Sequence, residues 1–445
     1  MTMRAGEAAL RTSRFVTFDG GFCATNEHQR PDRYRHLELD LGKRKRIARG
    51  AGLSYAAASF GGASLVQQMT AFDRLLSFDP EARTLRVEAG ASIGAVVRWA
   101  ARHRLTVAVV PGYPSITIGG CIAADVHGKN PMRDGTFADW VESMTVYHPA
   151  HGFRTVGRDD EVRFDATCGG YGLTGVVVDA TLRLVPQPAP HVRVEHQPVH
   201  SLEHAIESID QASAADFAYS WHDGASRGKE FGRGILFRGT WTDAAAPDDD
   251  GAFAPMTAET RARWPFPCWN GASIGMANVA FRRLNLRTSV RVKSAFDAAF
   301  PFARQTLYHR FFGRRGLAEV QALIPDGAMP AFVDALRRVI DREDPLVVML
   351  SVKRFRGRSA SLGMSGTGVL LAMDVARNDR TPAFLREVDA IVLATGSQPN
   401  VAKDSRLPSD VAARSLRGIG SFSDVLRRLD PDRLYESELS LRLGL

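Results

Sequence analysis

The chain has 445 residues, of which 44% are hydrophobic and 24% are charged, and these values are ordinary for a folded globular protein. Its net charge of +8 could favour anionic ligands, nucleic acid or a membrane surface, but it is too small to select among them. Because single cores stop growing at about 250–300 residues, we expect two domains.

The start of the chain lacks the apolar segment of a signal peptide, and nowhere do about eighteen apolar residues follow one another as a spanning helix requires. We therefore expect a cytoplasmic protein without a transmembrane segment. The four cysteines, Cys23, Cys121, Cys168 and Cys268, lie far apart without a paired metal-binding spacing. Free thiols and no metal site are expected.

Residues 1 to 40 are polar and are predicted to be irregular. A short strand at Ile47 then leads into the glycine-containing loop Arg49–Tyr55. The backbone N–H groups of such a loop can cradle a pyrophosphate, with Arg49 and Ser54 as further donors. The alternative is a hairpin turn after the basic run Lys43–Arg46, which by itself is more typical of a solvated face than of a nucleic-acid patch.

Residues 84 to 90 alternate apolar and polar side chains and predict a strand, after which Ser92 can cap a helix. The stretch from 110 to 130 combines turn residues, adjacent glycines and a His-Gly-Lys-Asn corner, more chemistry than a connector needs. Residues 141–146 and 175–185 follow as predicted strands, with a second glycine-rich segment at 168–175.

Prolines at 186–190 suit a linker between domains, since proline cannot continue a central strand. The part beyond it is predicted to mix helices and strands: a helix over 202–212, a strand over 319–325, a helix from Pro330, strands over 346–352 and 369–374, and a helix that Thr381 caps and Gly396 ends.

The glycine loops, the Pro-Gly…Thr-Ile-Gly-Gly segment at 111–120 and the corner at 127–130 occur at spacings that resemble one family, the FAD-linked oxidases of the vanillyl-alcohol oxidase type. Within that family the chain is most similar to the decaprenylphosphoryl-ribose 2′-oxidases. The similarity is tight over residues 47–186 and loose over 190–400.

The resemblance implies an α+β fold. It consists of a PCMH-type FAD-binding domain of two subdomains at 1–188, an α+β substrate or cap domain at 189–400, and a C-terminal segment at 401–445 that returns to the FAD domain. The implied cofactor contacts are Arg49, Gly50, Ala51, Gly52, Leu53, Ser54, Tyr55, Pro111, Gly112, Tyr113, Thr117, Gly119, Gly120, Ala123, Ala124, His127, Gly128, Asn130, Gly175, Val176 and Lys403.

By the same resemblance His127 and Lys129 lie beside the flavin ring, while Lys353 and Lys403 reach it from the cap. A fixed cation such as Lys403 suits the negative charge that hydride transfer leaves on the flavin N1–C2=O group, and Lys353 could hold or deprotonate the substrate hydroxyl if desolvation lowers its pKa. Each lysine alone is more often a surface charge, and His127 alone a core histidine.

The mode of flavin attachment follows from what is missing. Relatives that bind flavin covalently use a histidine where this chain has Leu53, and some add a cysteine near the position of Tyr113. We therefore expect noncovalent FAD.

The pocket departs from the ribose oxidases. Alanine and leucine at Ala299, Leu370 and Ala372 replace a tyrosine, an asparagine and a cysteine, and the paired glutamines become Glu319 and Gln321. With Lys353, these last two are the expected substrate contacts. The changed wall means that a lipid-linked ribose is not assumed as the substrate.

The leading prediction is an FAD-dependent oxidoreductase that converts a secondary alcohol of a sugar-like or polyol substrate to a ketone by hydride transfer to flavin N5. Two alternatives are an aldonolactone-type oxidase or dehydrogenase and a catalytically inactive FAD-binding partner subunit. Either oxygen or a quinone-like acceptor, or a partner reductase, could exchange electrons with the flavin. No nucleic-acid partner is expected.

Overall fold

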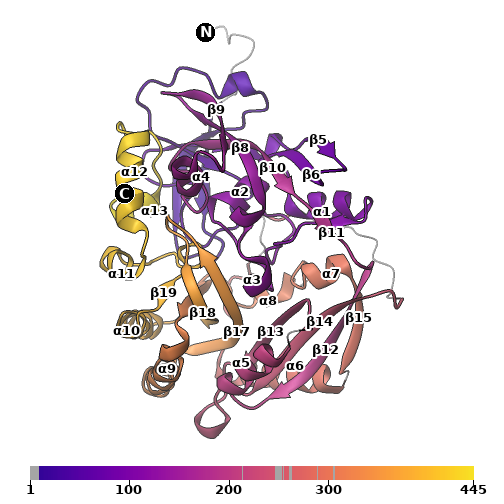
Figure 1. Cartoon of the computed structure of the whole chain (residues 1–445). Coiled ribbons are helices and arrows are strands. Elements are labelled where there is room, and N and C mark those ends of the chain that lie inside the picture. Colours follow the sequence, from indigo (N-terminus) through magenta and orange to yellow (C-terminus); the bar gives the residue numbers. More distant parts are fainter. Residues whose placement is uncertain are drawn as a thin grey trace.

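The computed structural model describes residues 10–212, 214–245, 253, 255–259, 263–287, 289–303 and 306–445. The fold is α+β: three smaller sheets, of four, five and two strands, form one region with their helices, and an eight-stranded sheet with its helices forms the other (Figure 1). All four cysteines are free, as expected.

The first small sheet has the order β1-β2-β4-β3. Its strands are β1 (Arg11–Val16), β2 (Cys23–Gln29), β4 (Leu65–Gln68) and β3 (Arg46–Arg49). The prediction that residues 1–40 are irregular is therefore wrong for the described part. Only Phe15 of β1 is buried, against Phe60, so the strand shows no apolar alternation.

The second sheet has the order β5-β6-β10-β8-β9 and confirms the predicted strands. Ser92 caps α1 as expected, since its side chain accepts from the Ala95 N–H. The elements of this part are β5 (Leu75–Asp79), β6 (Thr84–Glu88), α1 (Ile93–Ala101), β7 (Leu105–Thr106), α2 (Ile118–Ala123), α3 (Pro131–Asp134), β8 (Val141–His148), β9 (Gly152–Gly157), α4 (Glu161–Thr167), β10 (Val176–Arg183) and β11 (Val185–Pro186).

The large sheet has the order β15-β12-β14-β13-β17-β18-β16-β19. The predicted strands at 319–325, 346–352 and 369–374 are present, and the last two are longer than predicted. The strands are β12 (His191–Val199), β13 (Phe217–Asp223), β14 (Gly234–Thr242), β15 (Val290–Ser294), β16 (Leu317–Ile324), β17 (Leu346–Arg358), β18 (Ser365–Ala376) and β19 (Gln398–Pro399).

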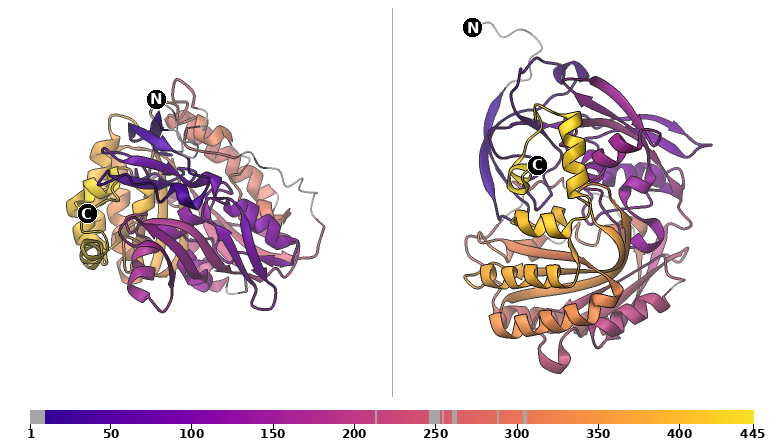
Figure 2. Two further views of the ribbon diagram at one scale, coloured as in Figure 1. Left: turned by 90° about the horizontal axis from the view of Figure 1, so that it is seen from above. Right: turned by 60° about the vertical axis from the view of Figure 1, so that its left-hand side comes forward.

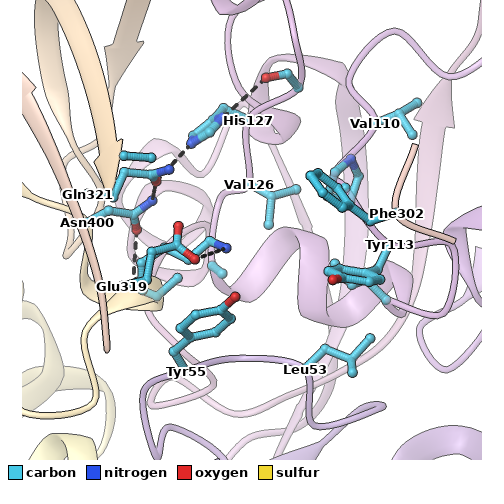
Figure 3. A pocket seen from close by; sticks show the side chains of 18 of the residues that line it. Leu53, Tyr55, Val110, Tyr113, Val126, His127, Phe302, Glu319, Gln321 and Asn400 are labelled. Carbon is cyan, nitrogen blue, oxygen red and sulfur yellow. Dashed lines mark hydrogen bonds and ion pairs between the residues drawn. The ribbon is translucent and has the colours of Figure 1, made fainter. Parts of the chain in front are cut away.

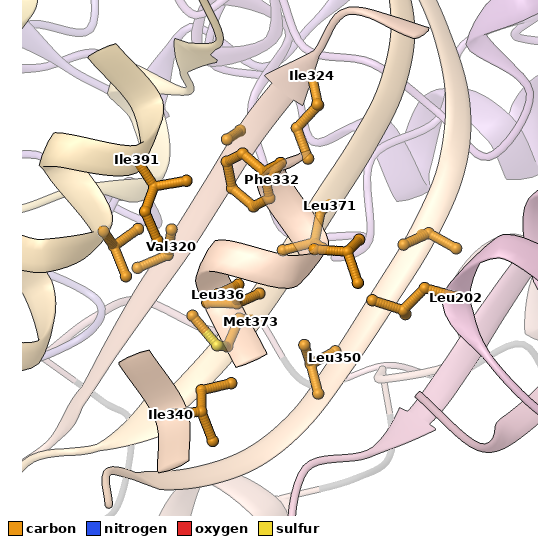
Figure 4. Close-up of a cluster of buried hydrophobic side chains, with 14 of the residues drawn as sticks. Leu202, Val320, Ile324, Phe332, Leu336, Ile340, Leu350, Leu371, Met373 and Ile391 are labelled. Atoms are coloured by element: carbon orange, nitrogen blue, oxygen red, sulfur yellow. The ribbon is translucent and has the colours of Figure 1, made fainter. Parts of the chain in front are cut away.

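Three helices cover one face of this sheet, and their apolar stripes form the core in Figure 4: α5 (Leu202–Gln211), α9 (Met329–Glu343) and α10 (Thr381–Ala394). The predicted cap of α10 is wrong. Thr381 is the first helical residue, and its N–H and hydroxyl both donate to the side-chain oxygen of Asn378, so the asparagine organises the turn before the helix.

The opposite face of the sheet is partly covered by α6 (Gly271–Arg287), which packs against β12, β13, β14 and β17. Two short helices, α7 (Ala295–Ala299) and α8 (Thr306–Arg310), follow it along the chain.

The chain then returns to the first region through α11 (Ser409–Ser415), α12 (Ile419–Leu429) and α13 (Glu438–Leu443). These helices share a core with Phe15, Ile47 and Phe60, and Tyr435 forms a parallel bridge with Arg46. In the right-hand view of Figure 2 they lie in front of the early strands.

Candidate flavin and substrate site

One cavity of about 890 Å³ lies between the two regions (Figure 3). One wall comes from loops of the first region, and the opposite wall comes from β16, β17, β18 and the segment after β19. The site is thus assembled from chain segments more than 300 residues apart.

The first wall contains the loop that follows β3. Within the described part of the chain, the backbone N–H groups of residues 51–54 meet no acceptor. Gly50 lies so close to Thr117 that an added Cβ would be 2.2 Å from its hydroxyl oxygen, and Gly52 has a φ of +69°. Unpaired successive N–H groups in a glycine loop fit an anionic group such as a pyrophosphate.

The side-chain donors of this loop are directed elsewhere. The buried guanidinium of Arg49 donates to Ser59 at 2.8 Å and to the Glu259 carboxylate, while the Ser54 hydroxyl donates to the Ala402 carbonyl at 3.3 Å. The groups that this loop leaves for a ligand are therefore its backbone N–H groups.

The second part of this wall runs from Val110 to Gly128 and includes α2, which Thr117 caps by accepting from the Gly120 N–H. Tyr113 faces the cavity and packs on Phe18 with ring centroids 5.4 Å apart. Its hydroxyl is hydrogen-bonded to the His309 Nε2 atom. Tyr113 is thereby fixed in position.

The floor of the cavity is one face of the large sheet. Glu319 and Gln321 of β16 lie opposite Asp374 and Ala372 of β18, and Lys353 of β17 belongs to the same face. Alternate residues of a strand point to the same side, so this register brings their polar groups together.

A hydrogen-bonded row crosses this floor to the first wall. The Lys353 ammonium lies 2.9 Å from the Gly128 carbonyl and 3.1 Å from the His127 Nδ1 atom. The His127 Nε2 atom lies 3.3 Å from the Gln321 side-chain oxygen, to which the Asn400 amide also donates (Figure 3). With Nδ1 accepting from Lys353, His127 carries its proton on Nε2 and donates to Gln321.

Burial sets the protonation of this row. Desolvation, followed by the charge of Lys353, lowers the pKa of His127 to about 3, so its imidazole is neutral at neutral pH. Desolvation and the charge of Lys403 lower the pKa of Lys353 to about 7. Lys353 can therefore gain and lose a proton near neutral pH, whereas His127 serves as a hydrogen-bonding group.

Two more lysines line the cavity. Lys403 pairs with Glu319 at 3.1 Å and lies 4.4 Å from the centre of the Tyr55 ring. Lys129 donates to the carbonyls of Ala298 and Ala299 at the end of α7. Burial, with the charges of Lys353 and Lys293, lowers the pKa of Lys129 to about 7.

Comparison with known proteins agrees with this geometry. Residues 42–154 match the family of FAD binding domains. The chain is 28% identical over 91% of its length to a decaprenylphosphoryl-beta-D-ribose oxidase from Mycolicibacterium smegmatis, of which it covers 90%.

The chain is an FAD-dependent oxidoreductase that is similar to the FAD-linked oxidases. Further relatives match over 36% of the chain: a D-lactate dehydrogenase from Anaerostipes hadrus at 25% identity, with 34% of that protein covered, and L-galactono-1,4-lactone dehydrogenase 2 from Oryza sativa at 30%, with 27% covered. These two shared regions are much shorter than that of the ribose oxidase.

The oxidoreductase brings nearly all of the predicted site residues into this cavity. Two of the predicted cofactor residues lie outside its lining. Asn130 donates to the Asp216 carbonyl at 2.8 Å, and Val176 is buried in a cluster with Tyr147. Each is one residue away in the chain from a residue that lines the cavity, Lys129 in one case and Gly175 in the other.

The altered pocket residues are only partly where they were expected. Ala299 and Ala372 line the cavity, but Leu370 packs instead with Leu323 and Phe355. The loss of polar groups on this wall of the oxidoreductase thus rests on the two alanines.

Several cavity residues were not predicted from the sequence. Tyr308 donates to Asp374 at 2.5 Å, and Asn400 completes the polar row. The cavity also has an aromatic lobe under α6, lined by Phe217, Tyr219, Trp221, Phe237 and Phe281. The alternation of aromatic residues in β13 could have indicated this lobe.

In the described part of the oxidoreductase no group of three or more histidine, cysteine or acidic side chains could hold a metal ion. None of its described helices is both long and apolar enough to cross a membrane.

Proposed function

We propose that this oxidoreductase converts a secondary alcohol of a sugar-like or polyol substrate to a ketone. The observation that carries this proposal is Lys353, whose lowered pKa of about 7 places a proton acceptor on the cavity floor. Gln321 and Asn400 beside it offer several hydrogen-bonding groups, as a substrate with several hydroxyls requires.

The residues of the floor have separate tasks in this proposal. The neutral Lys353 amine accepts the proton of the substrate hydroxyl at its Nζ atom. Neutral His127, held between Lys353 and Gln321, keeps the amine oriented. Lys403, held by Glu319, adds a fixed positive charge to the cavity.

The first wall would hold FAD through the free N–H groups after Arg49 and through the 110–128 segment. When bound, FAD supplies the hydride acceptor. We propose noncovalent binding, because Leu53 and Tyr113 face the cavity where a histidine or cysteine link would be needed. Lys129 is a structural support of the same corner, since its ammonium is held by α7 carbonyls.

We also propose the domain division 1–188, 189–400 and 401–445. It is supported by the position of the cavity, which segments from all three parts line.

A lipid-linked ribose is one substrate to test rather than the assumed one, because Ala299, Ala372 and Glu319 change the pocket wall. An aldonolactone is another, although the lactone dehydrogenase similarity spans only 36% of the chain.

The test is anaerobic stopped-flow spectroscopy of the purified holoprotein with a panel of polyols, sugars, nucleosides and lactones. Bleaching of the flavin absorbance by a polyol or sugar is expected, and bleaching by lactones alone would refute the proposal. Acid precipitation should release the flavin into the supernatant. Yellow colour that stays in the pellet would contradict noncovalent binding.

A further inference from the structure

Helix α6 has an unusual distribution of side chains. Two of its three buried residues, Asn278 and Asn285, are polar, whereas Met276 is 69% exposed and Leu284 is 60% exposed. Helices of globular proteins normally place their apolar side chains inward. The outer side of α6 therefore carries apolar surface that the described part of the chain leaves exposed.

Helical spacing defines this outer side. Met276, Ala280 and Leu284 follow one another at intervals of four residues, and Arg283 and Arg287 lie beside them on the same exposed face. We refer to these five residues as the α6 face.

The segment of chain that contains the α6 face carries charges of one sign. Residues 263–294 contain no aspartate or glutamate, and their basic residues are Arg263, Arg282, Arg283, Arg287, Arg291 and Lys293.

Among the described residues no carboxylate forms an ion pair with the three arginines of α6, which are Arg282, Arg283 and Arg287. By contrast, Arg427 on α12, also on the surface, pairs with Asp424. Exposed apolar side chains next to arginines without a carboxylate partner fit an anionic lipid surface, because the apolar groups can enter the headgroup boundary and each arginine near the surface adds attraction.

We propose that the α6 face docks onto an anionic lipid bilayer surface. The apolar side chains of Met276 and Leu284 enter the headgroup boundary, while Arg283 and Arg287 contact lipid phosphates and keep their stems along the apolar surface. The absence of any acidic residue in 263–294 favours a lipid surface over a second copy of this chain, since two copies would bring like charges together.

The α6 face borders the cavity. Leu284 belongs to both surfaces, and Phe281 and Arg291 line the cavity next to it. Docking therefore places the α6 side of the cavity next to the lipid. This inference concerns the binding of the protein to a lipid surface and does not depend on the proposed reaction.

The experiment is co-sedimentation of the full-length holoprotein with two kinds of vesicle, phosphatidylcholine alone and phosphatidylcholine containing phosphatidylglycerol. Binding to the anionic vesicles only is expected, and it should fall as salt is added. Failure to sediment with the anionic vesicles at low salt would overturn the proposal.

Variants of the α6 face decide whether this surface is the one that binds. Arg283→Gln with Arg287→Gln should weaken binding roughly 30-fold, and Met276→Ser should weaken it about fivefold. None of these three residues lines the cavity, and all are exposed, so the retained flavin and the melting temperature report that each variant is folded.

The matched controls lie on other helices. Arg427→Gln with Arg428→Gln on α12 removes the same charge, and Val162→Ser on α4 removes a side chain that is 55% exposed. Controls that weaken binding as much as the α6 variants would contradict the assignment. A concentration-dependent dimer in sedimentation velocity that Met276→Ser abolishes would assign the α6 face to a second copy instead.

Discussion

The two walls of the cavity are built by different means. The wall of the first region presents mainly backbone: the glycine loop after β3, with its free N–H groups, and α2 with its capping threonine. The floor presents side chains from neighbouring strands of the large sheet, held in a row by hydrogen bonds from Lys353 to Asn400.

Because of this difference, we expect the first wall to bind the cofactor and the floor to carry out the reaction. Backbone donors hold any ligand with the right anionic shape and tolerate changes in side chain, but they depend on close approach of the chain. Side chains on a sheet face can be exchanged one at a time without altering the register. Variants of the first wall should therefore affect cofactor retention, and variants of the floor should affect turnover.

The largest effect is expected from Lys353→Met. Without the amine there is no proton acceptor of matched pKa on the floor, so kcat/KM should fall about 10²–10⁴-fold while FAD stays bound. Steady-state kinetics and the flavin spectrum measure the two quantities. Equal loss of flavin and activity would contradict the separation of the two walls.

The pH dependence of the unaltered protein also tests whether Lys353 is the proton acceptor. Lys353 must be neutral to accept a proton, and its pKa is about 7, so kcat/KM should fall about tenfold for each pH unit below about 7. The pH profile of initial rates measures this fall in kcat/KM directly. A flat profile between pH 5 and pH 8 would remove Lys353 from the role of base.

On the opposite wall, Gly50→Ala places a Cβ 2.2 Å from the Thr117 hydroxyl oxygen, so either the loop or the side chain that caps α2 must shift. FAD affinity should weaken by at least ~30-fold, equivalent to about 2 kcal/mol. The ratio of flavin to protein absorbance after gel filtration measures it. Gly275→Ala is the control, because a Cβ there meets nothing within 4 Å, and it should keep its flavin.

Glu319→Gln tests whether the floor can be changed without disturbing the wall. The substitution removes the ion-pair partner of Lys403 and a carboxylate from the substrate side. We expect KM to change about tenfold and the FAD content to stay constant. Glu230→Gln removes an exposed ion pair with Arg233 and should alter neither, and a loss of FAD in Glu319→Gln would show that the floor also holds the cofactor.

The smallest effect is expected for Lys129→Met. The folded pKa of Lys129 lies near 7, below the ordinary 10.5, so the unfolded chain binds more protons between these values and stability rises with pH across that window. The variant should lack this rise in stability with pH, which amounts to a few degrees in Tm. Melting curves at pH 7 and pH 10 measure it, with the exposed Lys229→Met as a control that keeps the wild-type difference.

The sequence predicted the first wall better than the floor for a physical reason. Glycine loops and caps are local, so the residues from Arg49 to Tyr55 and around Thr117 carry their own signal. The floor depends on register: Glu319 meets Asp374 only because β16 and β18 pair, and no local pattern reveals that Asp374 faces the cavity.

Helix α6 was missed for a related reason. Its inner side carries Asn278 and Asn285 and its outer side Met276 and Leu284, so the apolar periodicity that predicts a helix packed on a core is absent. Asn130 and Val176 show the limit of a motif, which locates a turn of chain but not which of two adjacent side chains enters the cavity.

The contact between residues 55–56 and residue 402 has a consequence for how the protein is made. The Tyr55 and Ala56 N–H groups both donate to the Ala402 carbonyl, and Leu439 donates to the Ala57 carbonyl. During synthesis the loop after β3 emerges early, but its partners at residues 402 and 439 emerge much later. The early part of the chain must therefore stay incompletely packed until these residues have left the ribosome, and yellow colour should appear only on nascent chains that extend beyond them.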